Sequence, residues 1–222
     1  MGTWDSIVLY FENNMGAYLT MLRQHVDISL RVLIITILIG VPLGILCVAF
    51  QMHQRRIFGT VQTLVIGTVQ ILRIIPSLAV LVLSIRYLGI GMGPAMVALV
   101  LLAVPPVLMN TVAGLEEVPF FMLESAKAMG MTPVQVWVKV RLPLALPLML
   151  AGIKTAMVEI VASATIAALI GAGGFGQIIF QGLSVRRTEL LLIGGISVAV
   201  LALVVALLMD LFERLLLRYK YV

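Results

Sequence analysis

Long runs of apolar residues, separated by short polar stretches, dominate this chain. Because a helix needs about 20 apolar residues to cross a bilayer, five of these runs predict membrane-spanning helices. They lie at about residues 28–50, 58–85, 90–113, 143–170 and 190–212. Arg73 and Pro76 interrupt the second run near its middle. The pattern therefore predicts an all-α membrane protein with about five transmembrane helices, or six if the second run is split.

The stretches outside these runs are of two kinds. Residues 1–27 carry four aromatic side chains and predict an amphipathic segment at the outer interface, where aromatic rings concentrate. Residues 115–141 are mixed and charged, and they predict a loop between the third and fourth spans. No repeat or low-complexity segment divides the chain. We therefore expect residues 1–222 to form one transmembrane domain with its core at 28–215.

Lys and Arg are unequally distributed around the predicted spans, and this predicts the orientation. One side carries the larger group: Arg55, Arg56, Lys127, Lys139, Arg141, Arg214, Arg218 and Lys220. The other side carries Arg23, Arg31, Arg86, Arg186 and Arg187. Since cytoplasmic loops are enriched in Lys and Arg, the C-terminus and the 115–141 loop are predicted to be cytoplasmic. A sixth span would overturn this topology.

Composition narrows the class of protein. The chain is 62% hydrophobic and 11% charged, with a mean hydropathy of +1.16, whereas soluble domains are about half apolar and about a quarter charged. The net charge of +5 lies at the ends of apolar runs, so we expect no nucleic-acid partner. Cys47 is the only cysteine, and His25 and His53 lack neighbouring ligands, which predicts neither a disulfide nor a metal site.

The stretch LIGAGGFGQ contains the spacing G-x-G-x-x-G at Gly171, Gly173 and Gly176. In dinucleotide-binding proteins this motif follows a strand and opens a helix. Here it follows a long apolar run, and the residues after it are too short and irregular for such a helix. Glycine accepts positive φ and close packing. We therefore interpret these residues, with Gly174, as a bend that acts as a hinge after the fourth span.

Three ionisable residues, Arg73, Lys154 and Glu159, lie within predicted spans. Such groups are costly in a membrane and usually face a pathway or a partner. Lys154 is near enough to the predicted cytoplasmic end of its span to extend to the interface, or it pairs with Glu159 or with the helix of Arg73. Arg73 lies deeper. Together with Pro76, Ser77 and Glu159 it is our candidate for the pathway or gate.

The 115–141 loop predicts two short helices. Pro119 can open the first, and Gly130 can close it in a left-handed conformation. Thr132-Pro133-Val134-Gln135 has the capping-box arrangement, with proline at the first helical position. Pro143 either ends this second helix or starts the next span.

Small and charged residues in the first of these helices suggest a surface for another protein. Ala126 and Gly130 are four residues apart, so that a partner can approach the backbone closely, while Glu124 and Lys127 offer polar contacts. A solvated amphipathic loop is the alternative on these local features alone.

A family resemblance begins in this loop. Glu124-Ser125-Ala126, Gly130 and Val140-Arg141-Leu142-Pro143 resemble the signature of ABC-importer permease subunits: Glu-Ala-Ala, three residues, Gly, nine residues, Ile-x-Leu-Pro. Ser for Ala and Val for Ile are mild departures. The resemblance implies that this loop is the coupling helix that docks into a separate ATPase subunit. The coupling positions would be Glu124, Ser125, Ala126, Gly130, Thr132 and Pro143.

Three further stretches resemble the osmoprotectant branch of these importers, which carries glycine betaine, carnitine or choline. They are IPSLAVL, LPLALPLMLAGIKT and ATIAALIGAGGFGQIIFQGL. Methionine-type importers share the signature and the glycine-rich stretch but are less similar around AGIKT. One departure is Arg73-Ile74-Ile75, where the branch often has a polar Gln-Thr. A zwitterion such as a betaine would tolerate Arg73 better than choline would.

The resemblance also implies partners. These are two ABC ATPase subunits that hold the ATP and Mg²⁺, a second permease that is identical or homologous, and an extracytoplasmic substrate-binding protein. The chain itself would carry no cofactor and no catalytic residue, and it would lie in a bacterial inner membrane. The alternatives are a methionine or other amino-acid ABC permease, and a self-contained secondary carrier that uses Arg73 and Glu159. A membrane enzyme is disfavoured because no nucleophile–base or metal constellation is evident.

Overall fold

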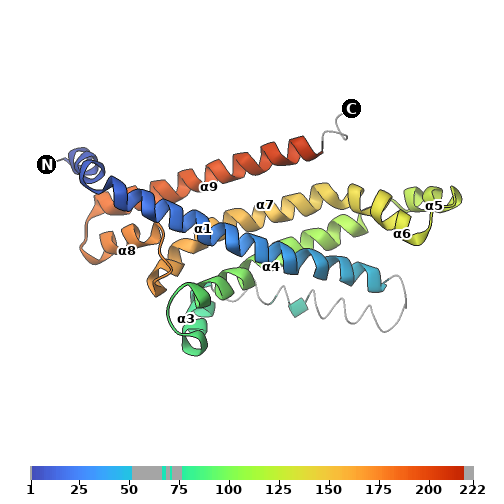
Figure 1. Cartoon of the computed structure of the whole chain (residues 1–222), viewed down its shortest axis with the longest axis horizontal. Coiled ribbons are helices and arrows are strands. Elements are labelled where there is room, and N and C mark those ends of the chain that lie inside the picture. The colour runs from blue at the N-terminus through green and yellow to red at the C-terminus, as the bar shows by residue number, and fades with distance from the viewer. Residues whose placement is uncertain (1, 52–66, 69–70, 72–76, 218–222) are drawn as a thin grey trace. The chain divides into compact units, whose positions relative to one another are not determined.

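The computed structural model describes residues 2–51, 67–68, 71 and 77–217, and its regular elements there are all helices (Figure 1). The main elements are α1 (Thr3–Gln51), α3 (Ser77–Leu88), α4 (Met92–Glu116), α5 (Phe120–Ala128), α6 (Pro133–Val136), a π-helical turn (Trp137–Arg141), α7 (Leu142–Ala167), a 3₁₀ turn (Ala168–Ile170), α8 (Gly176–Ser184) and α9 (Thr188–Leu216). The prediction of an all-α membrane protein is confirmed.

Four stretches of the described residues are helical, long and apolar enough to cross a membrane. They are Thr3–Ala49, Met92–Glu116, Pro133–Ile170 and Thr188–Leu216. These correspond to the first, third, fourth and fifth predicted spans. The second predicted span lies mostly outside the described residues, apart from the part that forms α3. A total of five or six spans therefore stays a prediction.

The first helix begins much earlier than the sequence pattern predicts. Helix α1 starts at Thr3, and its backbone departs from helical geometry only at Asn14, where φ is −127° and ψ is 15°. The side chains of Asn13 and Asn14 donate to the carbonyls of Leu9 and Tyr10 at 2.8 and 3.0 Å. Since such side chains compete with the helical backbone bonds, they account for the local break.

The helix after the polar loop follows the second of the two predicted alternatives for Pro143, the start of the next span. Pro143 does not end the second short helix, because α6, the π-helical turn and α7 follow one another without interruption from Pro133 to Ala167. A π-helical turn contains an extra residue per turn. Pro143, which has no N–H to donate, is the second residue of α7 and lies two positions after the end of this turn. The proline is therefore accommodated near the start of the span and not at the end of the loop.

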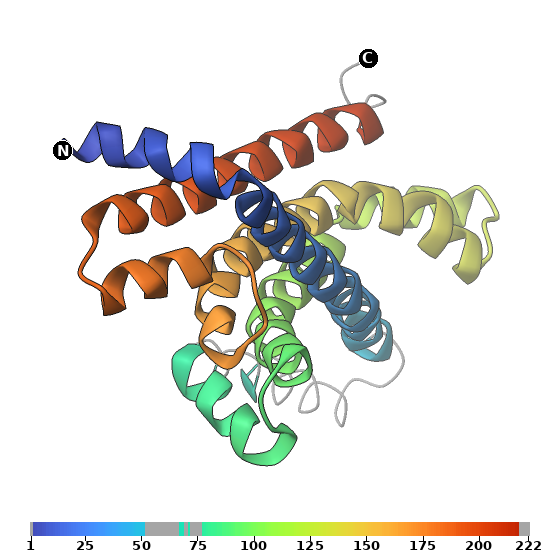
Figure 2. The same cartoon turned by 60° about the vertical axis from the view of Figure 1, so that its left-hand side comes forward.

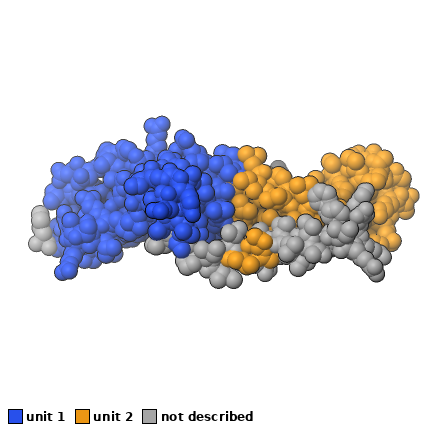
Figure 3. All heavy atoms as spheres, turned by 90° about the horizontal axis from the view of Figure 1, so that it is seen from below, with its two compact units in different colours: residues 1–35, 75–103, 157–208 blue, residues 36–74, 104–156, 209–222 orange. Residues whose placement is uncertain are grey.

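The chain forms two compact units (Figure 3). Unit 1 comprises residues 1–35, 75–103 and 157–208, and unit 2 comprises residues 36–74, 104–156 and 209–222. Helices α1, α4, α7 and α9 each contribute one part to each unit.

In unit 1 a hydrophobic cluster joins α8 to α9. Its buried members are Phe175, Ile178, Leu190 and Ile193. Aromatic residues of the first part of α1 pack against it, among them Tyr10, Phe11 and Tyr18. The Tyr18 ring lies 5.1 Å from that of Phe175, and its hydroxyl is 2.8 Å from Ser197 Oγ. Three of the four aromatic residues near the N-terminus thus contribute to packing within the protein, whereas Trp4 is exposed.

In unit 2 glycines bring the backbones of α4 and α7 close together. A Cβ on Gly152 would lie 2.5 Å from Asn110 Cβ and 2.8 Å from the Pro106 carbonyl oxygen. A Cβ on Gly114 would lie 2.8 Å from the Ala145 carbonyl oxygen. Small residues at helix contacts are typical of membrane helices, because close packing replaces the hydrophobic driving force that lipid removes.

Candidate functional site

The loop between α4 and α7 folds into a small structure with its own core, which we call the elbow (residues 118–140; Figures 1 and 2). Helices α5 and α6 pack through four buried residues, Val118, Leu123, Ala126 and Val136, against which Met131 and Val140 also pack. The two short helices are thus held by side-chain packing in addition to their turn, so that the elbow has a defined shape.

The end of α5 is fixed by a left-handed glycine. Gly130 has φ +79°, the Gly130 N–H donates to the Lys127 carbonyl at 2.9 Å, and the Met131 N–H donates to the Ala126 carbonyl at 3.2 Å. These two bonds define a Schellman motif, and Met131 makes the hydrophobic contact that often accompanies it. The predicted left-handed closure at Gly130 is confirmed.

The start of α6 is fixed by the predicted capping box. The Gln135 N–H donates to Thr132 Oγ1 at 3.3 Å, and the Thr132 N–H donates to Gln135 Oε1 at 2.8 Å, with Pro133 at the first helical position. Both bonds satisfy donors that a helix N-terminus otherwise leaves without partners. Two cap motifs therefore flank a single residue, Met131, and set the angle between the helices.

Arg141 connects the elbow to the end of α4. Its Nε donates to the Leu115 carbonyl at 3.2 Å, and its guanidinium carbon lies 5.0 Å from the centre of the Trp137 ring. Leu115 is in the last turn of α4, where carbonyls lack helical donors and a positive charge is favourable. Arg141 thus satisfies a backbone carbonyl and fixes the π-helical turn at the same time.

Large apolar side chains cover the outside of the elbow. Phe120, Phe121, Met129, Val134 and Val138 are all more than half exposed, with Val134 at 71%. The charged residues Glu124 and Lys127 lie exposed on α5, near Phe120 and Phe121 in the sequence. An exposed apolar surface with charged residues among it is typical of a protein interaction site.

The predicted coupling residues have different environments in the elbow. Glu124, Ser125, Gly130 and Thr132 are exposed, and Pro143 is half-buried at the start of α7. Ala126 is only 2% exposed, because it lies in the core of the elbow. Its small side chain serves the contact between α5 and α6, so the expectation that it admits a partner's surface is wrong.

The predicted pathway residues are described only in part. Arg73 and Pro76 lie outside the described residues. Ser77 is the first residue of α3, and Glu159 is a half-buried residue of α7 in unit 1. Their assignment to a pathway or gate stays a prediction.

Lys154 pairs with a residue that sequence reasoning did not consider. Its ammonium forms an ion pair with Asp210 of α9, within unit 2. This ion pair joins α7 to α9 and takes the place of the expected pairing with Glu159. Extension of Lys154 to the interface stays a prediction, and the alternative pairing with the helix of Arg73 involves a residue outside the described ones. Asp210 lies 56 residues away in the sequence, near the end of the last apolar run, and nothing local relates it to Lys154.

The glycine-rich stretch forms a tight turn between α7 and α8. Gly171, Gly173 and Gly174 have φ of +81°, +83° and +85°, and a Cβ on Gly176 would overlap the Thr165 carbonyl oxygen. The predicted bend with positive φ and close packing is confirmed. Its role as a hinge stays a prediction.

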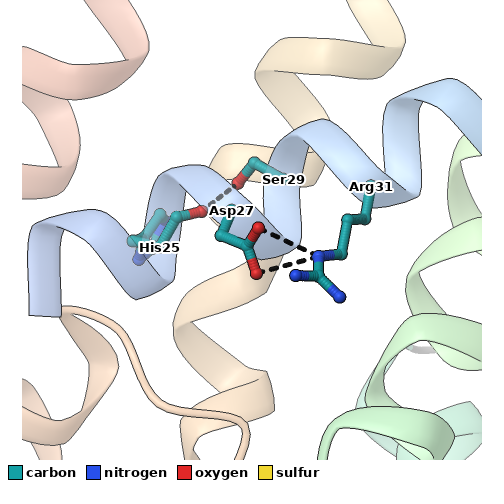
Figure 4. A network of polar contacts seen from close by, with 4 residues as sticks. All are labelled: His25, Asp27, Ser29 and Arg31. Carbon is teal, nitrogen blue, oxygen red and sulfur yellow. Dashed lines mark hydrogen bonds and ion pairs between the residues drawn. The ribbon is translucent and has the colours of Figure 1, made fainter.

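Two residues of α1 that sequence reasoning did not assign to a site contact this turn. The Gly174 N–H donates to Gln24 Oε1 at 3.1 Å, and the Phe175 N–H donates to His25 Nδ1 at 3.2 Å. His25 is completely buried. Figure 4 shows that on the same stretch of α1 Ser29 Oγ donates to the His25 carbonyl, and Arg31 pairs with Asp27 at 2.9 Å. Gln24 and His25 stand among other polar and charged residues of α1, such as Arg23 and Asp27, so nothing local in the sequence marks them as partners of the turn.

Comparison with known proteins agrees with the resemblance carried by the elbow. Residues 40–218 match the family described as binding-protein-dependent transport system inner membrane component. The chain is 41% identical to the carnitine transport permease protein OpuCB of Listeria monocytogenes, over 90% of this chain and 88% of that protein. It is 39% identical to the choline transport system permease protein OpuBB of Bacillus subtilis, with 94% and 92% covered.

Solved structures of ABC transporters contain chains with a fold similar to that of this protein. An inward-facing structure of the MetNI methionine ABC transporter contains a chain that is 25% identical, with a TM-score of 0.81. The match covers 92% of this chain and 98% of that one. An amino acid ABC transporter solved with histidines gives a TM-score of 0.69 at 23% identity, covering 93% and 97%.

Proposed function

The chain belongs to the binding-protein-dependent transport system inner membrane components, and we propose that it forms the passage for a small osmoprotectant such as glycine betaine, carnitine or choline. It is a multi-pass permease of the ABC importer type. The observation that carries the substrate proposal is the likeness, over nearly the whole length, to permeases named for carnitine and choline. We place the protein in a bacterial inner membrane, as the family description suggests.

In this proposal the elbow is the surface that receives the ATPase. Three features support this. The elbow has a core and two cap motifs, so it can transmit force without unfolding. Its outside is apolar with interspersed charges. It continues through the π-helical turn into α7, so a displacement of the elbow is passed directly to a membrane-spanning helix.

We propose that the other components of the transporter are separate subunits. Two ATPase subunits hold the ATP and Mg²⁺, a second permease of the same or a related sequence completes the passage, and a binding protein delivers the substrate. This chain contributes no catalytic residue and no cofactor site. Closure of the ATPase pair moves the two elbows and switches the passage between inward-facing and outward-facing states.

The substrate is tested by competition in the assembled complex. We expect ATP-dependent uptake of one quaternary amine into vesicles, and we expect betaine, carnitine or choline to compete while methionine does not. Competition by methionine alone would favour an amino-acid permease, for which the fold of the MetNI structures is the supporting observation. Uptake by vesicles that contain this chain without an ATPase would favour a secondary carrier and would contradict the proposal.

The role of Arg73 is tested in the same assay. We expect the Arg73→Gln variant to discriminate less between betaine and choline, since an arginine in the passage repels a cation but tolerates a zwitterion. An unchanged preference would remove Arg73 from the passage. It would leave the assignment to this transporter family intact.

A further inference from the structure

The turn between α7 and α8 places two backbone donors, the N–H groups of Gly174 and Phe175, beyond the reach of helical acceptors. Their described acceptors are side chains of α1, Gln24 Oε1 for Gly174 and His25 Nδ1 for Phe175. The two segments are 150 residues apart in the sequence. In an apolar environment an unsatisfied N–H costs several kcal/mol. The turn can therefore keep this backbone conformation only while α1 supplies acceptors.

The His25 ring also contacts α7, which determines where its proton lies. Its Nε2 is 3.0 Å from the Val161 carbonyl oxygen, and its Nδ1 accepts from Phe175. A carbonyl can only accept, so Nε2 must carry the proton, and Nδ1 must be unprotonated. The geometry is thus satisfied by one form of histidine, the neutral Nε2–H tautomer. A cationic ring would direct an N–H toward the Phe175 N–H and break that bond.

Close packing around the His25 ring restricts this contact as strictly as the hydrogen bonds do. A Cβ on Gly174 would lie 2.9 Å from His25 Nδ1 and 3.3 Å from His25 Cβ. The His25 and Phe175 rings lie 5.6 Å apart, and both side chains are buried within unit 1. The glycines thus let the turn approach α1 closely enough for these hydrogen bonds to form. This arrangement joins α1, α7 and α8 at a single imidazole.

We propose that His25 is a positioning residue of the transport cycle: as the neutral Nε2–H tautomer it holds the glycine turn on α1 and α7, and substrate uptake requires the turn to be held. On this proposal the turn is a fixed joint within unit 1 and does not open as a hinge. The inference rests on the proposed transport function. Its molecular part, the held turn, is measured independently of transport.

Two substitutions each retain one of the two hydrogen-bonding groups of the His25 ring and remove the other. The Asn Oδ1 and the His Nδ1 are both bonded to Cγ, so His25→Asn retains an acceptor for Phe175 but cannot reach Val161. The Gln Nε2 lies one atom farther out, as His Nε2 does, so His25→Gln retains the donor to Val161 but leaves Phe175 without an acceptor. His25→Leu removes both. Ser29→Ala is the matched control, because its hydroxyl donates to the His25 carbonyl and not to the turn.

Hydrogen exchange at the Phe175 amide, in the assembled complex in lipid, reports whether the turn is held. We expect exchange about tenfold faster in His25→Gln and His25→Leu, the change that corresponds to the loss of one buried hydrogen bond. Exchange in His25→Asn and Ser29→Ala should remain at the wild-type rate. Equal acceleration in the Asn and Gln variants would contradict the assignment of Nδ1 as the acceptor.

Uptake by the same complexes tests whether the held turn matters for transport. Per assembled complex, we expect uptake to fall several-fold in His25→Gln and further in His25→Leu, while His25→Asn stays close to wild type. Faster exchange with unchanged uptake would overturn the positioning role while leaving the proposed function intact. Absence of uptake in the wild-type complex would instead count against the proposed function.

The tautomer itself has a spectroscopic signature. The chain contains two histidines, so ¹⁵N-histidine labelling in a His53→Gln background isolates the signals of His25. We expect solid-state NMR in lipid to show one protonated nitrogen, Nε2, and one unprotonated nitrogen, Nδ1. A cationic ring or an Nδ1–H tautomer would overturn the proposal.

Discussion

The elbow and the glycine turn both depend on glycines with positive φ, but they use them in opposite ways. At Gly130, among the described residues and apart from its two chain neighbours, no heavy atom lies within 4 Å of the position of a Cβ, so the glycine serves the backbone conformation alone. At Gly173 and Gly174 a Cβ would collide with Gln24 or His25, so the glycines serve conformation and close approach together. The elbow is closed by bonds between near neighbours, whereas the turn is held by residues 150 positions away.

This difference matches the functions that we propose for them. A docking element must keep its shape while its outer surface remains available, and local caps with a small internal core achieve this. A turn among membrane helices must satisfy every backbone donor internally, and distant side chains achieve this. Three substitutions separate the two cases, each with a comparison variant, and a double-mutant cycle on the ion pair between α7 and α9 sets the scale for a weak contact.

The largest loss of folding stability is expected for Gly176→Ala. A Cβ there would overlap the Thr165 carbonyl oxygen and would lie 2.7 Å from Ala168 Cβ, and a backbone carbonyl cannot move aside as a side chain can. We expect destabilisation above about 3 kcal/mol, measured as loss of properly folded protein in detergent. Gly195→Ala is the control, since in the described part of the chain no atom outside its own stretch of helix lies within 4 Å of its Cβ position. Equal losses in both variants would contradict the close packing of the turn.

The second-largest effect is expected for Ala126→Leu, on the packing of the elbow and on its affinity for the ATPase. The extra methyl groups would enter the core of the elbow, with a cost of about 1–3 kcal/mol, and would separate α5 from α6. The measurement is the affinity of the permease for its ATPase, which should fall. Ala128→Leu adds the same volume at an exposed position of the same helix. If Ala128→Leu weakens ATPase binding while Ala126→Leu does not, contact at the elbow's surface determines the affinity and its internal shape does not.

A somewhat smaller effect is expected for Gly130→Ala. Space is available, so the cost is the strain of a Cβ in the left-handed region, about 1–2 kcal/mol. Gly130→Asn should be milder, because asparagine tolerates this conformation better. Affinity for the ATPase should therefore follow the order Gly, Asn, Ala. A larger loss for Asn than for Ala would indicate that side-chain volume at the interface matters, and not backbone strain.

The smallest effect is expected for the ion pair between Lys154 and Asp210. Both side chains are at least a third exposed, so their coupling should be about 0.2–1 kcal/mol. A double-mutant cycle with Lys154→Met and Asp210→Leu, read by thermal unfolding, measures it directly. A coupling energy of zero would mean that the pair does not join α7 to α9 in the membrane.

The sequence predicts those features that depend on near neighbours. The capping box at Thr132 and the left-handed closure at Gly130 need only residues within five positions of each other, and both are confirmed. The apolar runs likewise predict α4 and α9 to within a few residues. Periodicity and cap residues carry this information because the interactions are local.

Features that depend on distant residues could not be predicted. Nothing around Lys154 indicates Asp210, and nothing around Gly174 indicates His25, because both contacts exist only once the helices pack. Local sequence also left open whether Pro143 ends the second short helix or starts the next span, and the structure places it near the start of α7, after the π-helical turn. The signature residue Ala126 was expected to face a partner, but it lies in the core of the elbow. A motif identifies the element without identifying the direction in which each side chain points.

The most direct test of the docking surface is site-specific crosslinking. Cys47 is the only cysteine, so a Cys47→Ser background permits single cysteines at exposed positions. Val134→Cys lies on the elbow and Val185→Cys follows α8, at 71% and 53% exposure in the native residues. With a short thiol-reactive crosslinker in the assembled complex, we expect Val134→Cys to form an adduct with the ATPase and Val185→Cys to form none. An adduct from position 185 and none from position 134 would contradict the elbow as the site of coupling.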